Sequence, residues 1–159
     1  MVTFYHGLYY KIRCMEKKHP LDSGIPCVKH RCNLCCVETK MPLSRSDIKQ
    51  ILKAGYNLRN FAVKTSEGWR LKNRSGKCVF LGEKGCKIYQ YRPEGCRLYP
   101  LVYDETSGTV RFDDVCPYNN EFKITKEDIR RLSDLLLRLV KEKREDVFTS
   151  TSSKTCFSK

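Results

Sequence analysis

The chain has 159 residues, of which 40% are hydrophobic and 31% charged, with a formal net charge of +13. This length suits one domain, or one domain with a helical appendage, and the composition allows only a thin core. We expect neither a membrane span nor a secretory signal, because no apolar run is long enough and the N-terminal MVTFYHGLYYKIRC has no cleavage site of small residues.

The first half of the chain predicts a lead-in, a cysteine-rich loop and a short helix. Residues 1–26 are basic and aromatic and end in the turn-rich run DSGIP. A helix is predicted near 44–54, with Ser44 and Asp47 as its capping pair and Gly55 at its end. Its apolar stripe consists of Ile48, Ile51 and Leu52.

The second half predicts short strands and one long helix. The segments FAVKT, WRLKN and CVFL, between residues 61 and 81, are separated by turn compositions and predict a small antiparallel sheet. LVYD and TVRFD, within 101–113, predict a further hairpin. Residues 125–146 predict an amphipathic helix capped by Thr125 and Asp128. Its apolar face consists of Ile129, Leu132, Leu135, Leu136, Leu139 and Val140.

We therefore expect the α+β class, as a small domain organised by metal. The predicted organisation is a lead-in over 1–26, a cysteine-cluster metal-binding domain over 27–118, a C-terminal helix packed on it over 119–147 and a flexible tail over 148–159.

Ten cysteines dominate the chemistry of this chain. We expect a cytoplasmic protein, where thiols stay reduced and clustered cysteines bind metal more often than they form disulfides. A secreted protein stapled by disulfides and a reduced cysteine-rich core without metal are the alternatives. Cys14 and Cys156 stand apart from the rest, and we leave them out of the site.

Along the chain the other eight cysteines form two groups. The first consists of Cys27, Cys32, Cys35 and Cys36, in which the Cys32-x-x-Cys35 spacing lets two thiolates meet on one metal. Since adjacent extended residues point to opposite sides, Cys35 and Cys36 should not ligate one ion together. His30 is interpreted as a solvated loop residue rather than a ligand.

The second group consists of Cys78, Cys86, Cys96 and Cys116. Its wide spacing does not fit a zinc ribbon but is compatible with an iron–sulfur cluster, whose ligands gather from across a fold. Zinc, as one ion or two, remains open because it also accepts four thiolates.

Several of these motifs together resemble the YkgJ-type cysteine-cluster family, a zinc- or iron-chelating domain. They are CNLCC (32–36), CVFL (78–81), CKIY (86–89), RPEGCRLYP (92–100) and CP (116–117). The pattern differs at Asn33, where the family often has glycine, and in the four residues between Cys27 and Cys32. The resemblance implies metal binding, by an iron–sulfur cluster, with [4Fe–4S] favoured, or by zinc.

Four thiolates around such a centre carry a net charge of about −2, which needs compensation. Lys87, Arg92 and Arg97 lie within four residues of proposed ligands and are predicted to supply it. Pro93 should begin a helical turn that brings Cys96 near a helix N-terminus. An electron-transfer or accessory role would follow.

An alternative is a basic module that binds RNA or associates with ribonucleoprotein and in which the metal is structural. The same basic surface could instead bind another protein. Its predicted contacts are Lys64, Trp69, Arg70, Lys72, Arg74 and Lys77, interleaved with Phe61 and Phe80. No nucleophile–base constellation emerges, so no residue is predicted to be catalytic. Whether the protein is an enzyme stays open, since a cluster with one open iron can catalyse.

Overall fold

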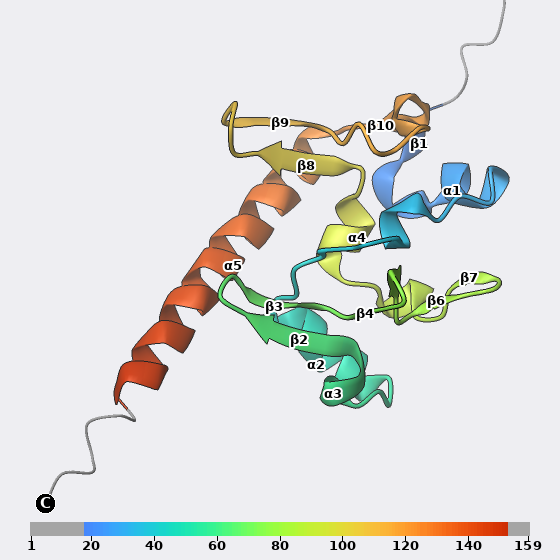
Figure 1. Ribbon diagram of the computed structural model, residues 1–159. Helices are drawn as coiled ribbons and strands as arrows, with labels where there is room; N and C mark the ends of the chain where they lie inside the picture. The colour runs from blue at the N-terminus through green and yellow to red at the C-terminus, as the bar shows by residue number, and fades with distance from the viewer. Residues whose placement is uncertain (1–17, 153–159) are drawn as a thin grey trace, which may run out of the picture.

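The computed structural model describes residues 18–152, in which a long C-terminal helix runs along one side of short helices and hairpins (Figure 1). In chain order the elements are β1 (His19–Pro20), η1 (Leu21–Ser23), α1 (Ile25–Lys29), η2 (Leu34–Cys36), α2 (Arg45–Lys53), α3 (Leu58–Phe61), β2 (Ala62–Thr65), β3 (Gly68–Leu71), β4 (Asn73–Arg74), β5 (Lys77–Cys78), β6 (Leu81–Gly82), β7 (Gly85–Cys86), η3 (Tyr89–Tyr91), α4 (Glu94–Leu98), β8 (Leu101–Asp104), β9 (Thr109–Phe112), η4 (Asn119–Glu121), β10 (Phe122–Lys123) and α5 (Lys126–Ser152).

The α+β class is confirmed, but the predicted small sheet is not a single sheet. The strands of residues 18–152 pair only two by two, as four antiparallel hairpins and the parallel pair β1–β10. The run CVFL is not one strand, because Cys78 ends β5, Val79 and Phe80 turn, and Leu81 begins β6. The hairpin over 101–113 is confirmed as β8–β9.

The predicted short helix is confirmed as α2. Ser44 and Asp47 form the capping box, and Gly55 follows with a φ of 90°. Ile48 and Ile51 are buried as predicted, whereas Leu52 is 42% exposed and lies outside the apolar face.

The predicted long helix is confirmed as α5, with Thr125 and Asp128 hydrogen-bonded at its start. Its buried face is narrower than predicted, because Ile129 and Val140 are 41% and 50% exposed. The helix continues to Ser152, into the segment predicted as a flexible tail. Predictions for residues 1–17 and 153–159, Cys14 and Cys156 included, lie outside the described residues. No described helix has both the length and the apolar character that a membrane crossing needs.

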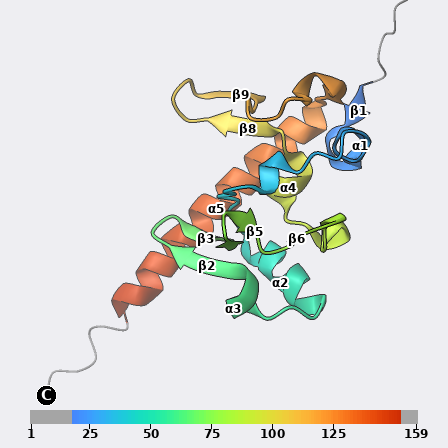
Figure 2. The same ribbon diagram turned by 45° about the vertical axis from the view of Figure 1, so that its right-hand side comes forward.

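Two buried clusters form the core, and cysteines belong to both. The first consists of Leu43, Ile48, Ile51, Phe61, Ala62, Leu71, Cys78, Phe80 and Ile88, with Cys36, Cys86 and Cys96 packed against it. The second consists of Leu21, Leu98, Leu101, Cys116, Phe122, Leu132 and Leu135, with Cys27 packed against it. α5 contacts α4, β3 and β8 (Figure 2), so the long helix spans both clusters.

Asp47 joins two helices through one buried carboxylate. Its Oδ2 accepts from the Ser44 amide at 2.9 Å and so caps α2. Its Oδ1 accepts from the Glu94 amide at 2.9 Å, which is the first amide of α4. One side chain therefore satisfies free amides of both helices and fixes the position of α4, on which Cys96 lies.

Replacing Asp47 by Ala should lower the free energy of unfolding by about 2 kcal/mol, because both caps are lost from a buried position. Urea unfolding at a fixed metal content measures the change. Glu127→Ala is the matched control, since it also removes a first-turn carboxylate but from an exposed pair with Arg130. Equal stability of Asp47→Ala and the control would contradict the double cap.

Candidate metal centre

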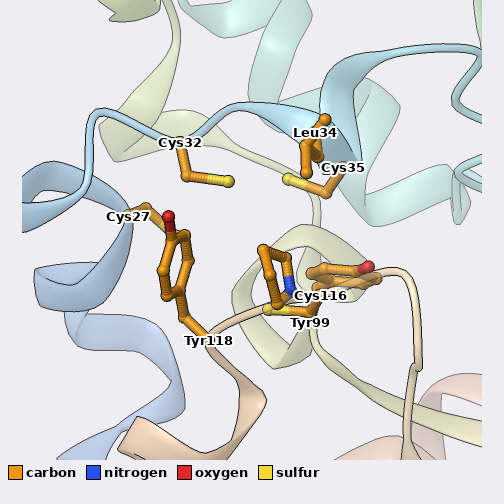
Figure 3. A pocket seen from close by; sticks show the side chains of 8 residues that line it. Cys27, Cys32, Leu34, Cys35, Tyr99, Cys116 and Tyr118 are labelled. Atoms are coloured by element: carbon orange, nitrogen blue, oxygen red, sulfur yellow. The ribbon is translucent and has the colours of Figure 1, made fainter.

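Four cysteines and two tyrosines surround a small cavity between α1, η2 and the segment that follows β9 (Figure 3). The cavity has a volume of about 10 Å³, which is room for one water-sized occupant. Its lining is Cys27, Cys32, Leu34, Cys35, Tyr99, Cys116, Pro117 and Tyr118. In Figure 3 the sulfur atoms of Cys32 and Cys35 point toward one another across this space. We call Cys27, Cys32, Cys35 and Cys116 quartet I.

The remaining four cysteines form a second group, quartet II, which consists of Cys36, Cys78, Cys86 and Cys96. Burial first, and then the proximity of the other three thiols, raises the pKa of Cys96. Burial likewise dominates the raised pKa of Cys78, to which Cys36 and Cys86 add. Cys36 also raises the pKa of Cys86. Every pair in quartet II is therefore close enough to interact electrostatically.

This arrangement in space differs from the order of the cysteines along the chain. Cys36 leaves its sequence neighbours for quartet II, and Cys116 joins Cys27 and Cys32 in quartet I. The reason is the turn η2, where Cys35 lines the cavity of quartet I while Cys36 packs against the first core cluster. We assign Cys35 to quartet I because it lines that cavity, although its thiol also contacts Cys36 and lies close enough to Cys96 for that thiol to raise its pKa. One peptide bond therefore joins the two quartets.

At Cys78, Cys86 and Cys116, the backbone amide of the second residue after the cysteine donates to the sulfur, and at Cys78 the Leu81 amide donates as well. Phe80 donates to Cys78, Ile88 to Cys86 and Tyr118 to Cys116, and each donation lowers the pKa of its thiol. In all three, burial outweighs the amide, and the net pKa is raised. In each of these motifs the second residue after the cysteine therefore has two roles. Its amide donates to the sulfur, and its aromatic or aliphatic side chain packs against the core.

The contact between the thiols of Cys35 and Cys36 in η2 shifts their two pKa values in opposite directions. A hydrogen bond from the Cys35 thiol lowers the pKa of Cys36 to about 7, and the same bond is the main cause of the raised pKa of Cys35. Burial is the largest cause of the raised pKa of Cys27 and of Cys116. A cation must therefore replace protons before all four sulfurs of either quartet can be thiolates.

The donor set of each quartet suits zinc or iron, since thiolate sulfur is a ligand that both accept. As they stand, no three Cys, His, Asp or Glu side chains of residues 18–146 are gathered tightly enough to hold one ion. In quartet I the sulfurs instead line different walls of the cavity.

Arg92 lies where the two quartets meet. Its side chain is 8% exposed and donates to the carbonyls of Tyr89 at 2.9 Å and Asp22 at 2.6 Å. Its guanidinium also lies 3.9 Å from the centre of the Tyr89 ring. Burial raises the pKa of Cys27 in quartet I and of Cys86 in quartet II, and Arg92 opposes this rise in both. The guanidinium therefore acts on both quartets at once.

The other two predicted charge-compensating residues are placed differently. Arg97 donates to the carbonyls of Arg92 at 3.2 Å and Gln90 at 2.5 Å, so it holds the turn that carries Arg92. Lys87 is exposed, and its amide bonds the Phe80 carbonyl. The predicted helical turn after Pro93 is observed as α4, with Cys96 in its first turn.

His30 is not a solvated loop residue, and that interpretation is wrong. Its Nε2 lies 2.5 Å from Glu121 Oε1, and its ring stacks on Tyr118 with centroids 3.8 Å apart. Lys29 also pairs with Glu121, at 3.1 Å. These contacts fasten the end of α1 to the segment that bears Cys116. No local pattern in the sequence indicates this pair, because Glu121 lies ninety-one residues from His30.

The predicted nucleic-acid residues do not form one stacking surface. Lys64 is 2.9 Å from Asp146 and lies over Trp69, which lines a cavity of about 70 Å³ beside α5. The aromatic partners named with them, Phe61 and Phe80, are buried and cannot stack on bases. Of the other four predicted contacts, Arg70 has a buried Nε without a hydrogen-bond partner, and Lys72 donates to the Arg59 carbonyl. Arg74 and Lys77 are exposed and lie opposite each other in the β4–β5 hairpin.

Comparison with known proteins gives one match. The profile of the CxxCxxCC family, described as "Putative zinc- or iron-chelating domain", matches residues 26–117, more than half of the chain. This range begins one residue before Cys27 and ends one residue after Cys116. Searches of curated proteins and of solved structures found no significant match.

Replacing Arg92 by Met should lower the free energy of unfolding by about 3 kcal/mol, because the carbonyls of Asp22 and Tyr89 both lose a buried charged donor. We also expect weaker metal binding at both quartets, measured as metal retained per chain during titration with a chelator. Lys87→Met is the matched control, since it removes an exposed cation near Cys86 and should change neither quantity. Loss of metal from only one quartet would contradict the shared position of Arg92.

Metal binding should release protons, because raised pKa values keep most of these thiols protonated at pH 7 in the metal-free fold. The apparent affinity should therefore rise with pH, by about tenfold per pH unit for each proton released per metal. Cys36, with its pKa lowered to about 7, contributes only a fraction of a proton. Calorimetric titration with Zn²⁺ in buffers of different ionisation enthalpy counts the protons. Release of fewer than one proton per metal would contradict the protonated state.

Proposed function

The chain belongs to the CxxCxxCC family of zinc- or iron-chelating domains, and on that premise we propose that it carries two metal centres, one in each cysteine quartet. The observation that carries the proposal is the division of Cys35 and Cys36 between two groups of four thiols. Four thiolates complete a zinc site or an iron–sulfur cluster, so eight cysteines suffice for two centres.

For both quartets an iron–sulfur cluster, [4Fe–4S] in particular, is the occupant we favour over zinc. Zinc draws four sulfurs to within about 2.3 Å of one point, whereas in a cluster each thiolate binds its own iron ion. Sulfurs on different walls of one cavity, as in quartet I, suit the second arrangement. The 10 Å³ volume is small for a cluster, so η2 and the 116–118 segment would have to move apart as it binds.

Electron transfer is the role that two such centres support best. A bound iron–sulfur cluster supplies one-electron chemistry, and amide donors to the sulfurs tune its potential. The amides of Phe80, Ile88 and Tyr118 are such donors, and Arg92 offsets negative charge at both quartets. The side chains of Leu34, Tyr99 and Tyr118 limit water at quartet I. Because the thiols must stay reduced, we place the protein in the cytoplasm.

Single replacements in the two quartets test the proposal. Cys116→Ser should remove the metal of quartet I and Cys96→Ser that of quartet II, so each variant retains about half of the wild-type content. Both should also unfold at lower temperature, because metal-binding energy is folding energy. Cys14→Ser and Cys156→Ser are matched controls, with thiols lost outside the site. Complete loss of metal in either quartet variant alone, with the fold intact, would favour one shared centre.

The identity of the metal is read from protein purified without oxygen. We expect a brown protein with about eight iron and eight sulfide ions per chain if both quartets hold a [4Fe–4S] cluster. Colourless protein with about two zinc ions per chain would contradict the cluster and keep the two centres. Absence of both metals at stoichiometric levels would contradict the proposed function itself.

A further inference from the structure

The end of the molecule that carries α2, α3 and the β6–β7 hairpin is strongly basic. Between residues 49 and 87 the sequence has ten Lys or Arg and only two Glu. One of these two, Glu67, is paired with Lys143 of α5. Figures 1 and 2 both show this end apart from the β8–β9 hairpin. Cations in this range therefore outnumber the carboxylates that could neutralise them.

An exposed tyrosine lies among these cations. The ring of Tyr56 is 36% exposed and packs edge-on against Phe80, with centroids 5.1 Å apart. The Phe80 carbonyl accepts from the Lys87 backbone amide at 2.8 Å, so the Lys87 main chain lies beside Phe80, and its exposed side chain extends over Gly82. Phe80 is 4% exposed, so a buried ring supports Tyr56 from below. Little conformational freedom remains for the tyrosine to lose when something stacks on it.

Two further cations, Lys72 and Arg59, lie near Phe61, which packs against Phe80. Phe61 lies 5.7 Å from Phe80, and its carbonyl accepts from the Lys72 amide at 2.8 Å. Lys72 Nζ donates to the Arg59 carbonyl at 2.5 Å, a contact that leaves its charge in place. We call Tyr56, Arg59, Lys72 and Lys87 the Tyr56 surface. Within the described residues, none of its three cations forms an ion pair with a carboxylate.

We propose that the Tyr56 surface binds single-stranded nucleic acid, with a base stacked on Tyr56 and the flanking phosphates held by Arg59, Lys72 and Lys87. Single strands expose base faces to aromatic rings, and stacking tolerates any base. Cations without carboxylate partners gain most from phosphates, because no internal ion pair has to break first. This function is separate from the metal centres and uses none of their eight cysteines.

The test is fluorescence anisotropy of the metal-loaded full chain with labelled oligouridine and oligodeoxythymidine of about 12 nucleotides. Three phosphate contacts predict a slope of about −2 in log affinity against log salt, so affinity should fall roughly twentyfold between 50 and 200 mM salt. RNA bound more tightly than DNA, or equally, supports the proposal. Binding to neither oligomer at 50 mM salt would overturn it, and so would binding only to vesicles that contain an anionic lipid.

Two sets of variants separate stacking from charge. Tyr56→Leu keeps an apolar side chain against Phe80 but removes the aromatic face, and should weaken binding at least fivefold. Tyr56→Phe keeps the face and should bind within twofold of wild type. Lys87→Glu should weaken binding about tenfold, whereas Lys141→Glu, the same charge change on an exposed part of α5, should have little effect.

Metal content and far-ultraviolet circular dichroism of each variant show whether its fold is retained. Equal losses in Lys87→Glu and Lys141→Glu would show attraction to net charge alone and overturn the assignment to this surface. Equal affinity of Tyr56→Leu and wild type would overturn the stacking. Because binding is scored on metal-loaded protein, either failure leaves the metal proposal intact.

Discussion

The peptide bond between Cys35 and Cys36 is the constraint on which the rest of the structure depends. Two adjacent side chains in η2 belong to different quartets, so neither quartet can be displaced without the other. The same division runs through the core. Quartet II packs with the first buried cluster, and Cys27 and Cys116 of quartet I pack with the second. α5 contacts elements of both and holds them in one body.

Short elements make such cross-linking necessary. The strands pair only two by two over two to four residues, and α1, α3 and α4 have five residues or fewer. An isolated hairpin or helix of this size is at best marginally stable in water. A bound metal would join turns that apolar burial alone holds weakly. Until a metal cation is bound, burial and the repulsion between neighbouring thiolates favour the protonated thiols. The single positive charge of Arg92 cannot balance eight thiolates.

Local sequence patterns predicted most of the secondary structure. The features that they did not predict depend on contacts between residues far apart in the chain. Capping pairs at Ser44 and Thr125 marked both helix starts, because a cap depends on residues three positions apart. The family motifs predicted eight cysteines as ligands, but the order along the chain does not show that Cys36 lies near Cys78, Cys86 and Cys96 or that Cys116 lies near Cys27 and Cys32. Their true neighbours come from segments far along the chain, which no local spacing records. The interpretation of His30 is wrong for the same reason, because its partner Glu121 lies ninety-one residues further along the chain.

The two proposed functions meet at Phe80. Its amide donates to the Cys78 sulfur, its ring supports Tyr56, and its carbonyl holds Lys87, the residue after Cys86. A change at quartet II that shifts the 78–86 segment would therefore move part of the Tyr56 surface. Of the cations between residues 49 and 87 of the described chain, Lys64 pairs with Asp146 of α5, whereas the three of the Tyr56 surface have no carboxylate in an ion pair. The three cations of the Tyr56 surface thus keep their charge next to the segment that carries Cys78 and Cys86, although the surface itself uses no cysteine.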